Sequence, residues 1–211
     1  VVDGKRVKAN SPADVLKPGD VVFVEEKPGK DGYMLRQPPE VSGGMVAMEA
    51  LRQAPERIVG AALLGTSAQP ETPDMRALRE AAIDLFAQGR VAEVIEPNVG
   101  FAFHPANAAR PELVEAYLEF VLRAGAGQLI RQNRAVIARP DARLHLPAVR
   151  CPVLVLCGQD DQLTPLARSE EIAALVPRAR LVTVPECGHM LTMEQPEFVN
   201  ATLQEWLAQF G

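Results

Sequence analysis

Two short loops carry the side chains best suited to chemistry in this chain. One loop contains Asp160 and Asp161 and follows an apolar run that ends at Cys157. The other contains His189 and follows an apolar run that ends at Val184. A carboxylate can orient an imidazole and stabilise its protonated form, and the imidazole can take a proton from a nucleophile and return it to a leaving group. The alternative is a surface turn and an exposed histidine.

Buried strands are predicted to bring these loops together. From residue 44 onward, helix-length amphipathic segments alternate with short apolar runs, which is a βα pattern. In an open α/β sheet, functional groups gather at the carboxyl ends of the strands. Strands are predicted at 58–64, 151–157 and 181–184, and helices at 45–53, 73–88, 111–122, 125–137, 166–175 and 197–210.

The composition changes near residue 42. Residues 1–41 are rich in Lys, Gly, Pro and Asp, with short strand-like runs at 21–24 and 33–35 between turn signals. We therefore expect a small β-rich segment at 1–42 and an α/β domain at 43–211, with a helical cap at about 70–140.

Residues 43–211 resemble a bacterial α/β-hydrolase of the esterase and lactonase kind. The resemblance runs through GGMVAMEAL at 43–51, AALLGTS at 61–67 and the two loops described above. It implies that Asp161 is the acid of a catalytic triad and that His189 is its general base. It also implies a small-molecule ester or lactone as substrate, with no metal or organic cofactor. The expected fold class is α/β, with a partial α/β-hydrolase sheet made of the last three strands.

The nucleophile position departs from the family pattern. That pattern reads Gly-x-Ser-x-Gly-Gly before the helix, and when it is aligned on the two glycines the nucleophile position falls on Val41. Ser42 follows one residue later, and if Ser42 served as the nucleophile instead, Glu40 would stand in place of the first Gly. A one-residue shift at a helix start turns a side chain by about 100°. Ser42 is therefore either a substitute nucleophile or a helix N-cap, and we expect little or no activity.

Residues 1–48 resemble a different family, the class A penicillin-binding proteins. The strings SPADVLKPGDVV at 11–22 and GYMLRQ at 32–37 are similar to their noncatalytic OB-like β segment. The adjacent Pro38 and Pro39 are incompatible with the central strand that should lead into a hydrolase nucleophile. We interpret the chain as a chimera that lacks the first half of the hydrolase sheet.

Two alternatives to an enzyme remain. The chain is either a noncatalytic binding or interaction module, or an engineered or generated chimera without a native function. Without its usual neighbours, the strand at 58–64 would have an open edge that invites self-association, unless the N-terminal segment pairs with it.

Composition narrows the choice of partners. The 211 residues carry a formal charge of −5, so nucleic acid is not an expected partner. No segment is apolar enough to span a membrane and none looks like a secretory signal, so we expect a soluble cytoplasmic protein. Cys151, Cys157 and Cys187 lack metal-ligand spacing and are predicted to be buried thiols.

Some polar residues have no clear assignment. His104 and His145 are predicted to be structural or exposed. Four residues of the cap and its exit either line a pocket or form surface ion pairs: Arg131, Arg134, Arg139 and Asp141.

Overall fold

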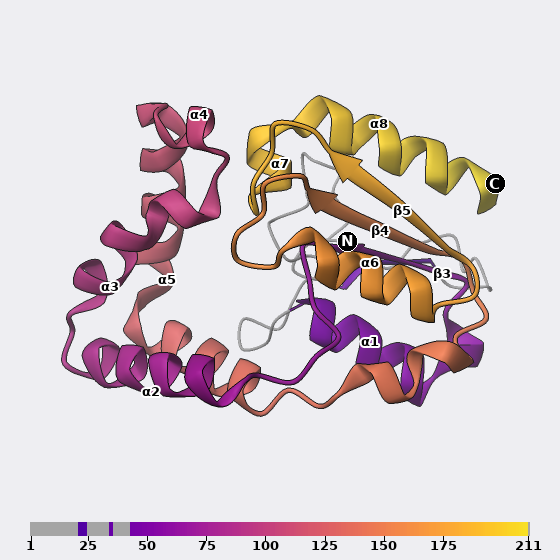
Figure 1. Ribbon diagram of the computed structural model, residues 1–211, viewed down its shortest axis with the longest axis horizontal. Helices are drawn as coiled ribbons and strands as arrows, with labels where there is room; N and C mark the ends of the chain where they lie inside the picture. The colour runs from indigo at the N-terminus through magenta and orange to yellow at the C-terminus, as the bar shows by residue number, and fades with distance from the viewer. Residues whose placement is uncertain (1–20, 25–33, 36–42, 211) are drawn as a thin grey trace.

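A computed structural model describes residues 21–24, 34–35 and 43–210 (Figure 1). Its strands are β1 (Val21–Val24), β2 (Met34–Leu35), β3 (Gly60–Leu64), β4 (Val153–Gly158) and β5 (Ala179–Val184). Its α-helices are α1 (Gly43–Gln53), α2 (Pro73–Ala87), α3 (Val91–Asn98), α4 (Pro105–Ala108), α5 (Pro111–Ile137), α6 (Leu166–Leu175), α7 (Leu191–Glu194) and α8 (Pro196–Leu207). Short 3-10 helices are η2 (Pro55–Arg57), η3 (Val99–Ala102), η4 (Ala142–Leu144), η5 (Leu146–Ala148) and η6 (Ala208–Phe210).

The described strands form one mixed sheet in the order β2-β1-β3-β4-β5. β3, β4 and β5 are parallel, as expected for the last three strands of the predicted sheet. β4 lies between two parallel neighbours, and all six of its residues are buried. Its uninterrupted apolar sequence is typical of a strand covered on both faces.

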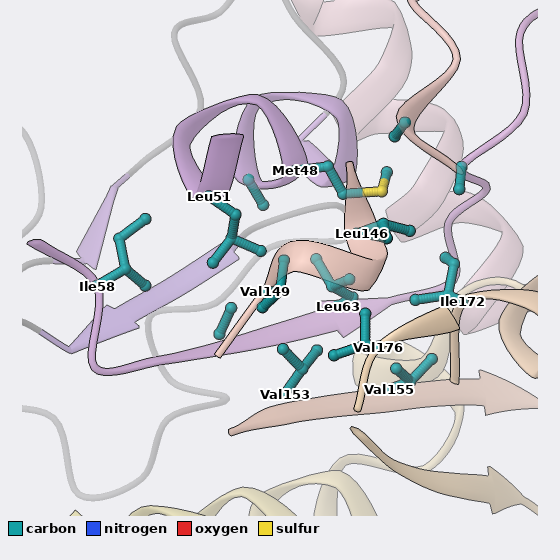
Figure 2. Close-up of a cluster of buried hydrophobic side chains, with 14 residues drawn as sticks. Met48, Leu51, Ile58, Leu63, Leu146, Val149, Val153, Val155, Ile172 and Val176 are labelled. Atoms are coloured by element: carbon teal, nitrogen blue, oxygen red, sulfur yellow. The ribbon is translucent and has the colours of Figure 1, made fainter. Parts of the chain in front are cut away.

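Helices cover both faces of this sheet (Figure 1). Val153 and Val155 of β4 pack in a cluster with residues of α1 and α6, which Figure 2 shows. Leu154 and Leu156 point to the opposite face and pack against α8, including Trp206. The alternation follows from the two-residue period of a strand, and it makes β4 the centre of both apolar clusters.

The helices between β3 and β4 form the cap, which extends to one side of the sheet (Figure 1). The predicted helices at 111–122 and 125–137 meet in α5 at a kink, where Gly125 has a φ of 79° that favours glycine. Helices α3 and α4 were not predicted, because eight residues containing Pro97 and four residues are too short for a clear period. No helix in the described part of the chain is long and apolar enough to cross a membrane.

β5 was predicted to be a buried strand, and the structure differs from this prediction. It begins at Ala179, two residues earlier than expected, and only Val184 of its six residues is buried. The reason is position, since β5 is an edge strand of the described sheet. The terminal helix predicted at 197–210 is α8 followed by the 3-10 turn η6.

β1 confirms the predicted strand at 21–24 and also pairs with the rest of the sheet. It runs antiparallel to β3, with Val22 opposite Ala62 and Val24 opposite Gly60. The edge of β3 that would otherwise be open is therefore paired along this stretch. The expected resemblance of residues 1–48 to penicillin-binding proteins falls mostly on residues outside the described ranges, as do Val41 and Ser42.

Candidate active site

The acid loop and the histidine loop lie side by side because β4 and β5 are parallel neighbours. Gly158 at the end of β4 is in register with Val184 at the end of β5. A Cβ at Gly158 would lie 2.0 Å from the carbonyl oxygen of Gly188, so only glycine permits this approach. The backbone N–H of Asp160 donates to the carbonyl of Cys187 at 2.9 Å and links the two loops directly.

Asp161 and His189 meet across these loops. Asp161 Oδ2 lies 2.9 Å from His189 Nδ1, the Asp161 side chain is fully buried, and the His189 side chain is 26% exposed. An ionised carboxylate only accepts hydrogen bonds, so the proton lies on Nδ1 and leaves Nε2 able to accept one. This tautomer is the one a general base requires.

The loop itself stabilises the Asp161 carboxylate. Asp161 Oδ1 accepts from the backbone N–H groups of Leu163 and Thr164 at 2.9 and 2.8 Å, and Oδ2 accepts from the Thr164 hydroxyl at 2.7 Å. Burial raises the pKa of Asp161, but the hydrogen bond and charge of His189 and the hydrogen bonds of Thr164 outweigh it, so the pKa is lowered. The group is therefore ionised at neutral pH.

Two other segments hold His189 in place. Its backbone N–H donates to the carbonyl of Ala102, in the cap, at 3.0 Å. Its ring packs against Gly65, just after β3, where an added Cβ would lie 3.3 Å from both Cε1 and Nδ1. Gly65 has a φ of 52°, which favours glycine for a second reason.

Helix α1 begins beside the same end of β3. Gly43 and Gly44 are buried, and a Cβ at Gly44 would lie 2.0 Å from Thr66 Oγ1. Thr66 follows Gly65, so the start of α1 and the His189 ring contact adjacent residues. Ser42 precedes α1 but lies outside the described residues, as does Val41.

Two residues that contact the Asp161–His189 pair or its backbone were not singled out in the sequence. Thr164 Oγ1 lies 2.7 Å from Asp161 Oδ2 and 3.2 Å from His189 Nδ1, so it touches both members of the pair. Glu194, at the end of α7, is only 7% exposed and accepts hydrogen bonds from both flanks of His189. The position of Thr164 three residues after Asp161 is a usable signal, whereas nothing local separates Glu194 from a surface carboxylate.

The histidines and cysteines outside the pair have structural contacts. His145 Nε2 lies 3.1 Å from the carbonyl of Met48, and His104 Nε2 lies 3.8 Å from Asp160 Oδ2. All three cysteines are free thiols. Burial raises the pKa of Cys157 to about 11 and also raises the pKa of Cys187, so neither is a ready nucleophile. No cluster of His, Cys, Asp or Glu in the described ranges is arranged to hold a metal ion.

Three of the four unassigned polar residues have partners within the protein. Asp141 pairs with Arg143 at 2.5 Å, and Arg131 donates to Gln128 Oε1 at 2.9 Å. Arg139 is largely buried, 3.8 Å from the buried Glu71. Arg134 is exposed. For Asp141 and Arg139, these contacts favour ion pairs within the protein over a role in lining a pocket.

Comparisons with known proteins show what this chain is similar to. Over 103 residues the chain is 36% identical to the protein named "Putative carbamate hydrolase RutD" of Escherichia coli (strain K12 / DH10B), a match covering 48% of this chain and 38% of RutD. A thermophilic esterase from Thermogutta terrifontis superposes with a TM-score of 0.75 at 29% identity, over 80% of this chain and 62% of the esterase. A hydrolase from Pseudomonas aeruginosa PA01 gives a TM-score of 0.70 at 29% identity, over 79% and 62%.

The chain thus spans less than two thirds of the length of each of these relatives. The family model described as the alpha/beta hydrolase family matches residues 42–202, about three quarters of the chain. That stretch contains α1, the three parallel strands, the cap and both loops of the site. The chain belongs to the alpha/beta hydrolase family.

Proposed function

We propose that this chain derives from a serine hydrolase of esters or lactones and that, with its present sequence, it hydrolyses them weakly or not at all. The contact between His189 Nδ1 and Asp161 Oδ2 at 2.9 Å carries this proposal. A buried carboxylate, an oriented imidazole and an Nε2 able to accept a proton make up two of the three parts of a triad.

The reaction class follows from what such a pair can activate. His189 Nε2 would remove the proton of a serine hydroxyl as the oxygen attacks a carbonyl carbon, and it would return that proton to the leaving oxygen. Asp161 would stabilise the imidazolium in between. The similarity to an esterase supports an ester substrate. The carbamate in the name of RutD presents the same kind of carbonyl carbon.

Weak or absent activity is inferred from the residues that precede α1. Val41 occupies the nucleophile position and has no atom that can attack a carbonyl. In the same alignment Pro39 stands where the family has the glycine whose small size permits the sharp turn at a nucleophile elbow, and if Ser42 were the nucleophile that position would fall on Glu40. Ser42, one position later, is proposed as an N-cap of α1 rather than as the nucleophile.

A gain-of-function experiment tests this proposal. Hydrolysis of p-nitrophenyl butyrate by the unmodified chain should stay near the uncatalysed rate, and Ser42→Ala should not change it. Val41→Ser, or Pro39→Gly combined with Val41→Ser, should raise the rate, and adding His189→Ala should lower it again by about 10²-fold or more.

Other outcomes contradict the proposal. Robust turnover by the unmodified chain that Ser42→Ala abolishes would make Ser42 the nucleophile. Failure of both restored variants, when each is folded by circular dichroism and carries no adduct after treatment with a fluorophosphonate, would contradict the descent of the site from a serine hydrolase.

We also propose that residues 1–42 are a separate β-rich segment joined to the hydrolase-like part near residue 42. The family match that begins at residue 42 and the change in composition there support this boundary. On this proposal, β1 takes the place beside β3 that an earlier strand of a longer hydrolase would occupy.

A further inference from the structure

Glu194 is a buried carboxylate that the proposed chemistry does not use. It lies at the end of α7, is 7% exposed, and accepts hydrogen bonds from four N–H groups. Burying a charged group is costly unless hydrogen bonds compensate for lost water. Four donors on one carboxylate supply that compensation and hold several segments at one point.

The two oxygens of Glu194 serve different segments. Oε1 accepts from the backbone N–H groups of Gly188 at 2.9 Å and Met190 at 3.2 Å, the residues on either side of His189. Oε2 accepts from the backbone N–H of His104 at 2.7 Å and from Asn107 Nδ2 at 2.9 Å. One carboxylate therefore joins the backbone that carries His189 to residues 102–107 of the cap.

Further contacts join the same two segments. The carbonyl of Ala102 accepts from the N–H groups of His189 and Met190 at 3.0 and 3.2 Å. A Cβ at Gly188 would lie 2.5 Å from the carbonyl carbon of Phe103, so the two backbones are in direct contact. Ala102, Phe103 and Met190 form one buried apolar cluster. The orientation of His189 therefore depends on where this part of the cap lies.

The loop also contains a conformation that needs support. Glu186 has a φ of 50°, in the left-handed region that favours glycine. Its carbonyl accepts from Asn107 Nδ2 at 3.2 Å, so the amide of Asn107 bridges Glu194 and the strained residue. The cap therefore contacts the histidine loop at Glu186, which precedes His189, as well as at His189 and the residues on either side of it.

We propose that Glu194 is a positioning residue that fixes the general base His189 to the helical cap through residues 102–107. This inference rests on the proposed function in so far as it takes His189 as the base. Only a carboxylate suits the site, because each of its oxygens faces two N–H donors. A glutamine side chain has one oxygen and one NH2 group, so its NH2 group would face two N–H donors and could not accept from them.

The test compares Glu194→Gln with Glu197→Gln, which changes an exposed glutamate nearby. The readouts are the NMR signals of the His189 ring and the hydrogen exchange of the Gly188 and Met190 amides. In Glu194→Gln, the ring signals should shift or broaden and the two amides should exchange about tenfold faster or more, because hydrogen bonds to a charged acceptor are lost. Glu197→Gln should leave both readouts unchanged.

A folded Glu194→Gln variant with His189 ring signals and their pH titration unchanged would overturn the proposal, even if its melting temperature fell. If that variant does not fold, Asn107→Ala removes one of the two cap donors to Glu194, together with the hydrogen bond from Asn107 Nδ2 to the carbonyl of Glu186. It should still shift the His189 ring signals, and unchanged signals would overturn the proposal. Neither readout depends on ester hydrolysis. Failure of the Val41→Ser variants to hydrolyse esters would therefore count against the proposed function alone.

Discussion

The Asp161 side chain accepts hydrogen bonds from Leu163, Thr164 and His189 although it has no exposed surface. Two of these donors are backbone N–H groups of its own loop, so the loop conformation holds the carboxylate before His189 contributes. The neighbouring Asp160 is less buried, with a side chain that is 42% exposed, and it lies 3.8 Å from His104. Two adjacent residues of the same type thus have different roles, and the difference is burial.

The lowered pKa of Asp161 makes the stability of the protein depend on pH. The unfolded chain, with an ordinary pKa of 3.8, binds the proton more readily than the folded one. The stabilisation is therefore complete above that value and is lost as the pH falls through the folded pKa. Asp161→Asn should lower the free energy of unfolding at pH 7 by about 2 kcal/mol.

Urea unfolding between pH 7 and pH 3 checks this expectation. The difference in free energy of unfolding between the unmodified protein and Asp161→Asn should be constant at pH 5–7 and should become smaller toward pH 3. Asp160→Asn is the matched control and should show little loss at any pH. If the free-energy difference for Asp161→Asn stays the same down to pH 3, the conclusion that Asp161 is ionised in the folded protein with a lowered pKa would be contradicted.

At the scale of elements, α1 and β3 must approach closely for the site to exist. Gly44 is buried at the start of α1, in contact with Thr66, and Gly65 beside it contacts His189. This packing places the start of α1 and the His189 ring against adjacent residues, Thr66 and Gly65. Helix propensity does not explain Gly43 and Gly44, since glycine weakens a helix, whereas close approach does explain Gly44.

Gly44→Ala should destabilise the protein by about 1–3 kcal/mol, because the new methyl group would overlap Thr66 and force α1 away from β3. Chemical unfolding followed by circular dichroism measures the loss. Gly100→Ala is the control, since an added Cβ there meets nothing within 4 Å. A Gly44→Ala variant as stable as Gly100→Ala would mean that α1 and β3 are not packed as described.

At the scale of the whole molecule, β1 connects the first segment of the chain to the parallel strands. It lies between β2 and β3 and pairs with both in antiparallel fashion. The alternative of self-association depends on an open edge at β3, and β1 occupies that edge at 60–62. A paired edge has few free N–H and C=O groups to offer another chain.

We therefore predict that the protein elutes as a monomer in size-exclusion chromatography. Phe23→Pro, in the middle of β1, should increase the fraction of larger species, because proline has no N–H and does not fit a strand paired on both sides. A substitution to alanine at the same position keeps the N–H and is the control. If the unmodified chain and Phe23→Pro show the same fraction of larger species, the inference that β1 prevents association by pairing with the edge of β3 would be contradicted.

Much of the fold could be predicted from local patterns. The apolar run of β4 and the segment of α6 were predicted within two residues of their observed bounds, because a strand or helix packed against the core repeats its apolar residues with a fixed period. The acid and histidine loops were predicted to meet because parallel strands end at the same edge. β5 was misjudged, since a short apolar run does not indicate whether a strand lies at an edge.

The sequence by itself determined the residue types of the candidate site, the α/β pattern and the valine at position 41, where the proposed nucleophile position falls. Only the tertiary structure decided that Asp161 is fully buried against His189, that Glu194 accepts from both the cap and the histidine loop, and that β1 pairs with β3. The physical reason is separation along the chain. Periodicity reports what a residue does within its own element, whereas burial of a carboxylate depends on donors from segments up to 90 residues away.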